Sequence, residues 1–388
     1  MKEIRYTVHD ALFSAYNDEP SWGIAHRIMA PAVSQSTDDI RIAELQDMVS
    51  QLMTKWTSNT EQTVDVTDSL YRLNLQSVVY CFFNQRVNYL DGGKPHIIEV
   101  LNSTATEMVR RPNRPKLLNW LFHSRGYNRN VKKFRKFAAD MITAKRAEQI
   151  PKRDLLYSLV YDKDPETGQS LDDERIIDEV VTIMITAATT TGLMSGAMYY
   201  LLANPRVMAK AREEVDGVLH SGGRITATKL NKKFSYCKAI LYETLRHADV
   251  VQGFFVEPDP LAHPSGILLA GGQYQIPRNQ MVTILLSAIS RDPEVFDDPE
   301  SFIPERMLGE AYDNLPSGAQ KWFGNGKRQC YGTRFASQLS LIVLIKALRS
   351  VDMEMADKEY KLKQSGAFFQ APDGLVALVR PRLDFSTT

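Results

Sequence analysis

The chain has 388 residues, of which 44% are hydrophobic, 24% charged and 9% aromatic, which is the composition of an ordinary globular protein. The net charge at pH 7 is only +1, and this balance argues against nucleic acid as the main partner. Three cysteines without a CxxC pair or a paired Cys/His spacing argue against structural zinc and a disulfide framework, and they favour a reducing, cytoplasmic compartment.

The N-terminal half contains several helical patterns. Residues 1–10 show no apolar core followed by a small-residue cleavage site, so we expect neither a signal peptide nor a membrane anchor there. Trp22 and His26 then follow one helical turn apart. Residues 40–56 carry apolar side chains at helical spacing, and residues 131–152 predict a basic amphipathic helix whose cations, Lys145 included, we expect to face solvent.

A long uncharged stretch covers residues 180–203 and would be long enough to span a bilayer. It is nevertheless rich in threonine and glycine and lacks the dense Leu, Ile and Phe of a lipid-facing helix. We therefore expect a helix buried in protein, because a helix that is apolar all round belongs in a large core. Acidic residues 172–174 favour its start, and Asn204-Pro205 favours its end, because the residue before proline is pushed out of the helical region.

The residue composition and the predicted secondary structure change after residue 250. Residues 238–247 still predict a helix, on which Glu243 and Arg246 share one face. Beyond it proline and glycine cluster, residues 281–286 and 374–379 resemble strands, and residues 332–351 return to helix. The sequence therefore predicts a mainly α body with a small β region and without tethered domains.

The most informative segment is Phe323-Gly-Asn-Gly-Lys-Arg-Gln-Cys-Tyr-Gly332, which runs directly into the last predicted helix. Cys330 lies just before that helix, where free N–H groups and the helix dipole lower the pKa of a thiol. Gly324 and Gly326 allow positive φ, so the backbone can bend and direct amides at the sulfur.

Two further residues of this segment suit a flat, anionic group. Gly332 leaves room for a close approach, and Arg328 carries a charge that matches a carboxylate or propionate. A low-pKa thiolate without a neighbouring His base indicates a metal ligand more than a protease nucleophile.

The pattern F-G-x-G-x-R-x-C-x-G, with six fixed positions, resembles the haem-ligand loop of cytochrome P450 monooxygenases. Glu243 and Arg246, then Pro304-Glu-Arg306, then the cysteine segment stand in the order that this resemblance requires. The resemblance is closest to the soluble bacterial and fungal fatty-acid hydroxylase branch. It implies the P450 fold over residues 1–388 as a single haem-binding domain, mainly α with a small β region. In that fold a long central helix lies over the haem and the cysteine loop lies on its proximal side.

The resemblance also assigns residues to the cofactor, haem b. Its iron would take Cys330 as the axial thiolate ligand, which favours O–O cleavage. The implied cofactor-binding residues are Trp22, His26, Phe323, Gly324, Arg328 and Gly332. Glu243, Arg246 and Arg306 would form a buried ionic network that holds the segment before the cysteine, a structural role.

The central helix departs from the family pattern, in which an acid precedes a threonine. Residues 186–192 read Thr-Ala-Ala-Thr-Thr-Thr-Gly, so one register places Ala188 at the acid position and a register slid by one places Thr189 there. The catalytic hydroxyl that hydrogen-bonds dioxygen would come from Thr189, with Thr190 as the next candidate. General-acid delivery contributes on the order of 10²–10⁴-fold in rate, so the missing carboxylate predicts weak coupling unless water chains substitute.

The resemblance also suggests substrate contacts and partners. Phe13 would lie above the haem, and Val251 and Phe254 would line the pocket for a small apolar substrate. The chain begins where relatives are already several dozen residues in, so we expect the N-terminal β-sheet and first helices of the family to be missing. It also ends without a flavin domain, so electrons from NADPH would come from a separate flavin reductase. An acidic partner could be attracted by Lys321, Lys327 and Arg334.

Three functions are compatible with these residues. The first is a monooxygenase that inserts one oxygen atom of O2 into an apolar substrate of fatty-acyl or secondary-metabolite type. The second is a peroxide-using or rearranging haem-thiolate enzyme, motivated by the missing acid before Thr189. The third is a truncated or degenerate relative without catalysis, motivated by the missing N-terminal segment.

Overall fold

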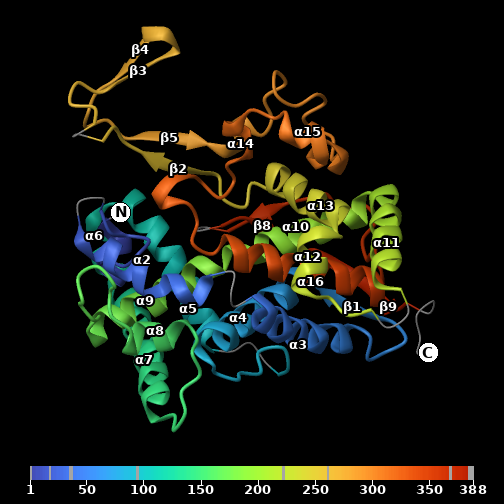
Figure 1. Ribbon diagram of the computed structural model, residues 1–388, viewed down its shortest axis with the longest axis horizontal. Helices are drawn as coiled ribbons and strands as arrows, with labels where there is room; N and C mark the ends of the chain where they lie inside the picture. Colours follow the sequence, from blue (N-terminus) through green and yellow to red (C-terminus); the bar gives the residue numbers. More distant parts are fainter. Residues whose placement is uncertain are drawn as a thin grey trace.

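The computed structural model describes residues 2–16, 19–34, 38–92, 96–220, 223–259, 262–366 and 369–382. Helices make up most of this part, as the sequence predicted, and the small sheets lie around them (Figure 1). The helices are α1 Lys2–Val8, α2 Pro20–Val33, α3 Asp38–Trp56, α4 Val66–Phe83, α5 His96–Arg110, α6 Lys116–Leu118, α7 Ser124–Ala147, α8 Leu155–Tyr161, α9 Asp173–Ala187, α10 Thr189–Ala203, α11 Pro205–Leu219, α12 Ala227–Lys232, α13 Ser235–His247, α14 Leu286–Ile289, α15 Gly309–Asp313 and α16 Thr333–Ser350.

The strands are short and pair antiparallel. They are β1 Gln62–Asp65, β2 Gly253–Val256, β3 Ile267–Leu269, β4 Tyr274–Ile276, β5 Val282–Leu285, β6 Val351–Met355, β7 Gln364–Ser365, β8 Ala371–Pro372 and β9 Val376–Pro381. In the described part, β1, β9 and β6 form a three-stranded sheet, and β2–β5, β3–β4 and β7–β8 form two-stranded ones. Figure 1 shows the β2–β5 and β3–β4 ribbons with α14 and α15 on one side of the helical body.

The uncharged stretch forms the expected buried helix, but in two parts. Asp172 caps α9 by accepting a hydrogen bond of 2.8 Å from the Arg175 N–H. The helix breaks at Ala188, and α10 then continues to Ala203, where Pro205 starts the next helix. In the described residues, Asp173–Ala203 is the one helical stretch apolar and long enough to cross a membrane, and 78% of its most apolar window is buried in the protein. The expectation of a protein-buried helix is therefore confirmed.

The basic helix differs from its prediction in three respects. It begins at Ser124 rather than at residue 131. It ends at Ala147 rather than at residue 152, because the ring of Pro151 would clash with the carbonyl four residues earlier. Lys145 is fully buried and pairs with Asp154 at 2.7 Å, so it does not face solvent. A buried lysine needs such a partner because desolvating an unpaired charge is costly.

The apolar core runs through the helices that carry the motif residues. Met184 of α9, Leu193 of α10, Ile240 of α13 and Ile342 of α16 all belong to one continuous buried cluster. A smaller cluster around Phe296 lies beneath the segment after α14. The central helix, the Glu243 helix and the helix after the cysteine therefore share one core.

Candidate functional site

The cysteine loop closes on itself just before α16. The Cys330 N–H donates to the Phe323 carbonyl at 2.8 Å, and Gly324 and Gly326 have φ of 72° and 62°, the left-handed region that favours glycine. Cys330 is exposed, whereas Cys81 and Cys237 are buried. A Cβ built on Gly332 would meet nothing nearer than the Cys330 sulfur at 3.9 Å. The loop thus presents an accessible thiol beside open space.

The pKa of Cys330 is raised, which corrects the expectation that this loop favours the thiolate. Although one side of the residue is exposed, the protein crowded around the thiol withdraws it from water and raises its pKa. The N–H groups of Gly332 and Thr333 and the Thr333 hydroxyl oppose that effect, as expected at a helix start, but they do not outweigh it. A metal ion bound to the sulfur would reverse this direction, because a coordinating thiol is deprotonated outright.

Aromatic and cationic side chains gather next to this loop. The Arg328 guanidinium lies 4.9 Å from the centre of the Trp22 ring, and the Trp22 and His26 rings lie 4.9 Å apart. Tyr331 extends the cluster, because its ring is 4.9 Å from His26 and its hydroxyl donates to the His26 carbonyl at 3.0 Å. Three residues predicted from motifs more than 300 positions apart therefore meet beside Cys330. Burial lowers the pKa of His26, which favours the neutral imidazole.

The N-terminal segment connects the cysteine loop to the central helix. Arg328 donates to the carbonyls of Leu12 at 3.2 Å and Ala15 at 2.7 Å. The Leu12 N–H in turn donates to the carboxylate of Glu179, at 3.0 and 3.1 Å from its two oxygens. The segment around Leu12 is thus bonded to Arg328 of the cysteine loop through its carbonyls and to Glu179 of α9 through an N–H group.

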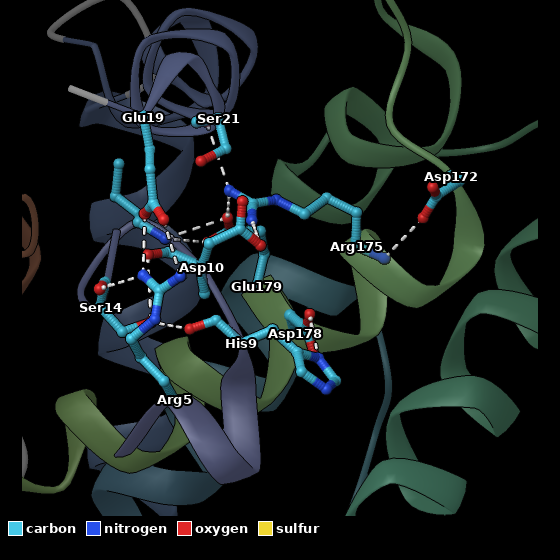
Figure 2. A network of polar contacts seen from close by, with 12 residues as sticks. Arg5, His9, Asp10, Ser14, Glu19, Ser21, Asp172, Arg175, Asp178 and Glu179 are labelled. Carbon is cyan, nitrogen blue, oxygen red and sulfur yellow. Dashed lines mark hydrogen bonds and ion pairs between the residues drawn. The ribbon is translucent and has the colours of Figure 1, made fainter. Parts of the chain in front are cut away.

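Glu179 belongs to the polar network of Figure 2, where α9 faces the N-terminal segment. Its carboxylate lies 3.2 Å from Arg175, which also forms an ion pair with Asp10. His9 contacts the neighbouring Asp178 at 2.9 Å. Glu179 is completely buried, and burial raises its pKa to about 7 against the opposing effects of Arg175 and the Leu12 N–H. Nothing in the sequence pattern pointed to this acid.

The Glu243 network forms as the motif order implied. Both carboxylate oxygens of Glu243 accept hydrogen bonds from Arg246, at 2.7 and 2.9 Å, and both side chains are fully buried. Arg306 Nε lies 3.2 Å from the same carboxylate, in ion-pair range but not aligned to donate a hydrogen bond. The Ile303 N–H donates to Glu243 at 2.9 Å. Burial raises the pKa of Glu243, but the hydrogen bonds from Arg246 and His247 bring it below its ordinary value.

The two arginines use their remaining donors on backbone carbonyls. Arg246 bonds those of Ser290 and Pro299, each at 2.7 Å, and Arg306 bonds that of Asp297 at 2.6 Å. His247, which the motif did not include, contacts Arg246 and the Ser301 carbonyl. The network therefore fixes the irregular segment between α14 and the 3₁₀ turn η5, Pro304–Met307.

The threonines lie at the break of the central helix. Thr189 is half-buried, and its hydroxyl donates to the Thr186 carbonyl at 2.9 Å, whereas Thr190 is buried. Asn74 of α4, which sequence reasoning missed, donates to the Ala187 carbonyl at 2.9 Å and to the Thr191 hydroxyl at 3.2 Å. Asn74 thus supplies a hydrogen-bond donor to a backbone carbonyl at the end of α9.

The predicted substrate contacts lie in two places. Phe13 is exposed in the turn after α1. Val251 precedes β2 and Phe254 lies in it. The neighbouring Val250 contacts α10, because a Cβ added to Gly192 would lie 3.0 Å from its side chain, and the Gln370 N–H donates to the Val250 carbonyl at 3.0 Å. A Cβ added to Gly192 of α10 would lie 2.2 Å from the Gln370 carbonyl, so only glycine fits at this contact.

Comparison with known proteins identifies the class. The family profile described as "Cytochrome P450" matches residues 3–378, and the chain belongs to the cytochrome P450 family. Among solved structures, the crystal structure of the cytochrome P450DA heme domain matches with a TM-score of 0.88 at 27% identity, covering 100% of this chain and 83% of that one. The fold and family expected from the sequence are therefore confirmed.

Curated relatives are longer proteins. The chain is 35% identical over 373 residues to the bifunctional cytochrome P450/NADPH–P450 reductase ascE of Acremonium egyptiacum, covering 94% of this chain and 35% of that protein. It is 34% identical over 381 residues to the self-sufficient cytochrome P450 monooxygenase CYP505U2 of Exserohilum turcicum, covering 96% and 35%. The chain thus spans about a third of the length of these relatives.

The residues present fit the haem-thiolate group that this family implies. The accessible Cys330 thiol supplies one soft ligand of the kind that haem iron takes. Gly332 leaves space beside the sulfur, because a Cβ at this position would lie 3.9 Å from it. Arg328 and Trp22 carry a guanidinium and an indole N–H, which are donors of the kind that bind carboxylates, and the Arg328 guanidinium donates to the Leu12 and Ala15 carbonyls in this structure.

Proposed function

We propose that this chain is a single haem-binding domain of a monooxygenase that hydroxylates a small apolar substrate of fatty-acyl or secondary-metabolite type. One oxygen atom of O2 would enter a C–H bond and the other would leave as water, with two electrons supplied by NADPH through a flavin reductase. The observation that carries the proposal is the accessible Cys330 thiol beside Arg328, Trp22 and His26, in a chain that belongs to the cytochrome P450 family.

Each residue has a proposed role. Cys330 would be the axial ligand, and thiolate-ligated haem, when bound, supplies the chemistry that cleaves the O–O bond. Arg328, Trp22 and His26 would bind the propionates, while Phe323, Gly324 and Gly332 shape the loop. Glu243, Arg246 and Arg306 would hold the preceding segment in place. Thr189, with Thr190 as the alternative, would hold a proton near the oxygen, and Phe13, Val251 and Phe254 would contact substrate.

The source of electrons belongs to the same proposal. The relatives named above are fusions of a P450 with its reductase or are called self-sufficient. For this chain we propose a separate NADPH-dependent flavin reductase. Of the three cations near the loop, Arg334 is paired with Asp38 at 2.5 Å, which leaves the exposed Lys327 as a better candidate for an acidic partner than Arg334.

The test is the carbon-monoxide difference spectrum of the reduced protein. We expect the band of a thiolate-ligated haem for the wild type and for Cys81→Ala, which changes a buried cysteine away from the loop. Cys330→Ser should lose that band. A spectrum of His-ligated haem, a haem-free protein, or an unchanged band in Cys330→Ser would refute the proposal.

A second function is favoured by one specific observation. Residues 180–203 contain no carboxylate, and Ala188 stands at the break of the central helix. A peroxide-using enzyme would need no proton delivery to O2, since peroxide brings both the oxygen and its reducing equivalents. Turnover with a hydroperoxide but not with NADPH, reductase and O2 would select this alternative over the monooxygenase.

A further inference from the structure

One face of the central helix carries an acid followed by hydroxyl groups. Glu179 is followed at intervals of three and four residues by Thr182, Thr186 and Thr189, which we call the hydroxyl row. At 3.6 residues per turn, the first three of these four positions lie within about 60° of one another around the helix axis. Glu179 and Thr182 are buried, whereas Thr186 and Thr189 are half-buried. The face therefore leads from a buried acid to the break of the helix.

Hydrogen bonds keep the hydroxyl row together across that break. The Thr186 hydroxyl donates to the Thr182 carbonyl at 2.8 Å, and the Thr189 hydroxyl donates to the Thr186 carbonyl at 2.9 Å. Thr189 therefore stays beside Thr186 although α9 ends at Ala187. Each hydroxyl oxygen has two lone pairs that can accept a hydrogen bond from water.

The Thr182 hydroxyl is the group that needs a further partner. Its oxygen is buried and has no hydrogen-bond partner among the described residues. A buried hydroxyl is costly unless it is hydrogen-bonded, and internal water is a common partner in polar sites. Side chains three or four positions apart on a helix have Cβ atoms about 5–6 Å apart, a gap that one bridging water can span. Water can thus join Thr182 to Glu179 on one side and to Thr186 on the other.

Glu179 has the properties of a proton donor at neutral pH. It is the last carboxylate before the uncharged stretch 180–203, and burial raises its pKa to about 7. A general acid works best when its pKa lies near the operating pH. Arg175 contacts the carboxylate at 3.2 Å and opposes protonation. The charged and titratable groups around Glu179 on α9, α7, the N-terminal segment and the cysteine loop are Arg175, Asp178, Arg135, His9, Asp10 and Tyr331.

Solvent reaches the other end of this arrangement. The side chain of Asp10 is 36% exposed and forms an ion pair with Arg175, which lies between Asp10 and Glu179 in the network of Figure 2. Water at Asp10 can therefore return a proton to the buried carboxyl group after it has been given up.

We propose that Glu179 supplies protons to Thr189 along the hydroxyl row, in place of the acid that the family resemblance expects next to this threonine. A proton leaves the Glu179 carboxyl group, passes through bridging water and the hydroxyls of Thr182 and Thr186, and reaches the Thr189 hydroxyl. Reduction of O2 with two electrons from NADPH, forming the product hydroxyl and one water, consumes two protons, and solvent restores each proton to Glu179. The inference rests on the proposed function, and Glu179 is a positioning residue because it acts through Thr189.

A purely structural role of Glu179 is the alternative, because its carboxylate also holds the Leu12 N–H. Glu179→Gln separates the two roles. The amide oxygen still accepts a hydrogen bond from Leu12, but the side chain has no titrating proton.

The experiment measures product formed per NADPH consumed between pH 6 and pH 8, with a flavin reductase and dodecanoic acid as the probe substrate. The wild-type yield should fall as pH rises through about 7, because the protonated carboxyl group is the donor. Glu179→Gln should be independent of pH and at least about tenfold lower at pH 6.

Threonine variants test the path. Thr182→Val and Thr186→Val should each lower the yield at pH 6 by about tenfold or more. The control is Thr104→Val on α5, since Thr104 is also a buried helical threonine and its hydroxyl donates to the Val100 carbonyl at 2.7 Å. This control should keep the wild-type yield.

An acid placed at the break should bypass the hydroxyl row. Ala188→Glu added to Glu179→Gln should restore the yield. In that double variant, a further Thr182→Val should make no difference.

Infrared spectra of the resting protein provide a measurement that needs no turnover. The C=O band of a protonated carboxyl group should titrate near pH 7 in the wild type and be absent from Glu179→Gln. Its frequency should change in Thr182→Val, which removes one end of the water bridge, and stay the same in Thr104→Val.

Three outcomes would overturn the inference. They are a wild-type yield and pH profile in Glu179→Gln, equal losses in Thr182→Val and Thr104→Val, and a carboxyl band that Thr182→Val leaves unchanged. A wild type that forms no product with NADPH would instead refute the proposed function, and the infrared titration would still decide whether Glu179 and Thr182 are joined.

Discussion

Ala188 is a small, buried residue at the break of the central helix, at or next to the position that the family resemblance assigns to an acid. If the chain is a monooxygenase, Ala188→Glu should raise the fraction of NADPH electrons that reach product, by about tenfold or more given what a positioned acid contributes. The measurement is product formed per NADPH consumed with a flavin reductase.

The control is Ala188→Gln, which brings nearly the same volume into the same crowded position without a titrating proton. Both variants share any cost of overpacking, so a gain limited to the glutamate reports proton delivery. Equal coupling in wild type, Glu and Gln variants would count against proton delivery as the defect and favour the peroxide-using alternative.

Glu179 should make stability depend on pH near neutrality. Its pKa is raised by burial from the ordinary 4.5 to about 7, so the folded protein holds this proton more tightly than the unfolded chain does. The contribution is therefore favourable at low pH and is lost as pH rises from about 4.5 to about 7, on the order of 3 kcal/mol in total. The stability lost between pH 5 and pH 8 should shrink in Glu179→Gln.

Urea denaturation at pH 5 and pH 8 checks this expectation. Glu213→Gln, which changes an exposed glutamate on α11, serves as the control and should run parallel to the wild type. Parallel curves for Glu179→Gln as well would show that this carboxyl is ionised throughout.

At the scale of elements, the Glu243 network holds an irregular segment that has little regular structure of its own. Glu243→Gln would leave the fully buried Arg246 without its counter-charge, and breaking a buried pair from one side costs about 3–5 kcal/mol. The urea midpoint should fall accordingly.

An exposed ion pair provides the comparison. Asp140 and Lys136 lie 2.8 Å apart with both side chains more than half exposed, and Asp140→Asn should cost less than about 1 kcal/mol. Similar losses in the two variants would mean that the Glu243 network contributes no more than a surface pair.

Sequence reasoning located the elements and contacts that short motifs encode. The Glu243–Arg246 pair follows from helical spacing, Arg306 follows from motif order, and the Trp22–His26–Arg328 cluster follows from the family resemblance. Hydrogen-bond partners that are distant in sequence and belong to no motif could not be predicted from the sequence. Asn74 bonds a carbonyl 113 positions away, and backbone groups such as those of Leu12 carry no side-chain identity at all.

Charges show the same limit. Lys145 was expected to face solvent because its helix is basic, yet its carboxylate partner Asp154 lies beyond the end of that helix. The thiol of Cys330 was expected to be acidic because a helix follows it, yet the crowding that raises its pKa comes from the tertiary structure. A local sequence pattern therefore indicates where charged and titratable groups stand on an element. Their burial in the tertiary structure, which the pattern does not show, shifts their pKa values.

At the scale of the whole molecule, the close contact at Gly192 links the central helix to the segment before Val251, which we propose contacts substrate. A Cβ added to Gly192 would lie 2.2 Å from the Gln370 carbonyl oxygen, and the Gln370 N–H donates to the Val250 carbonyl just before Val251. A methyl group at position 192 would push the Gln370 carbonyl away from α10. Because the Gln370 N–H is bonded to the Val250 carbonyl, Val250 would shift with it. If Val251 contacts substrate as we propose, a substitution at position 192 would therefore change the substrate pocket without touching the ligand.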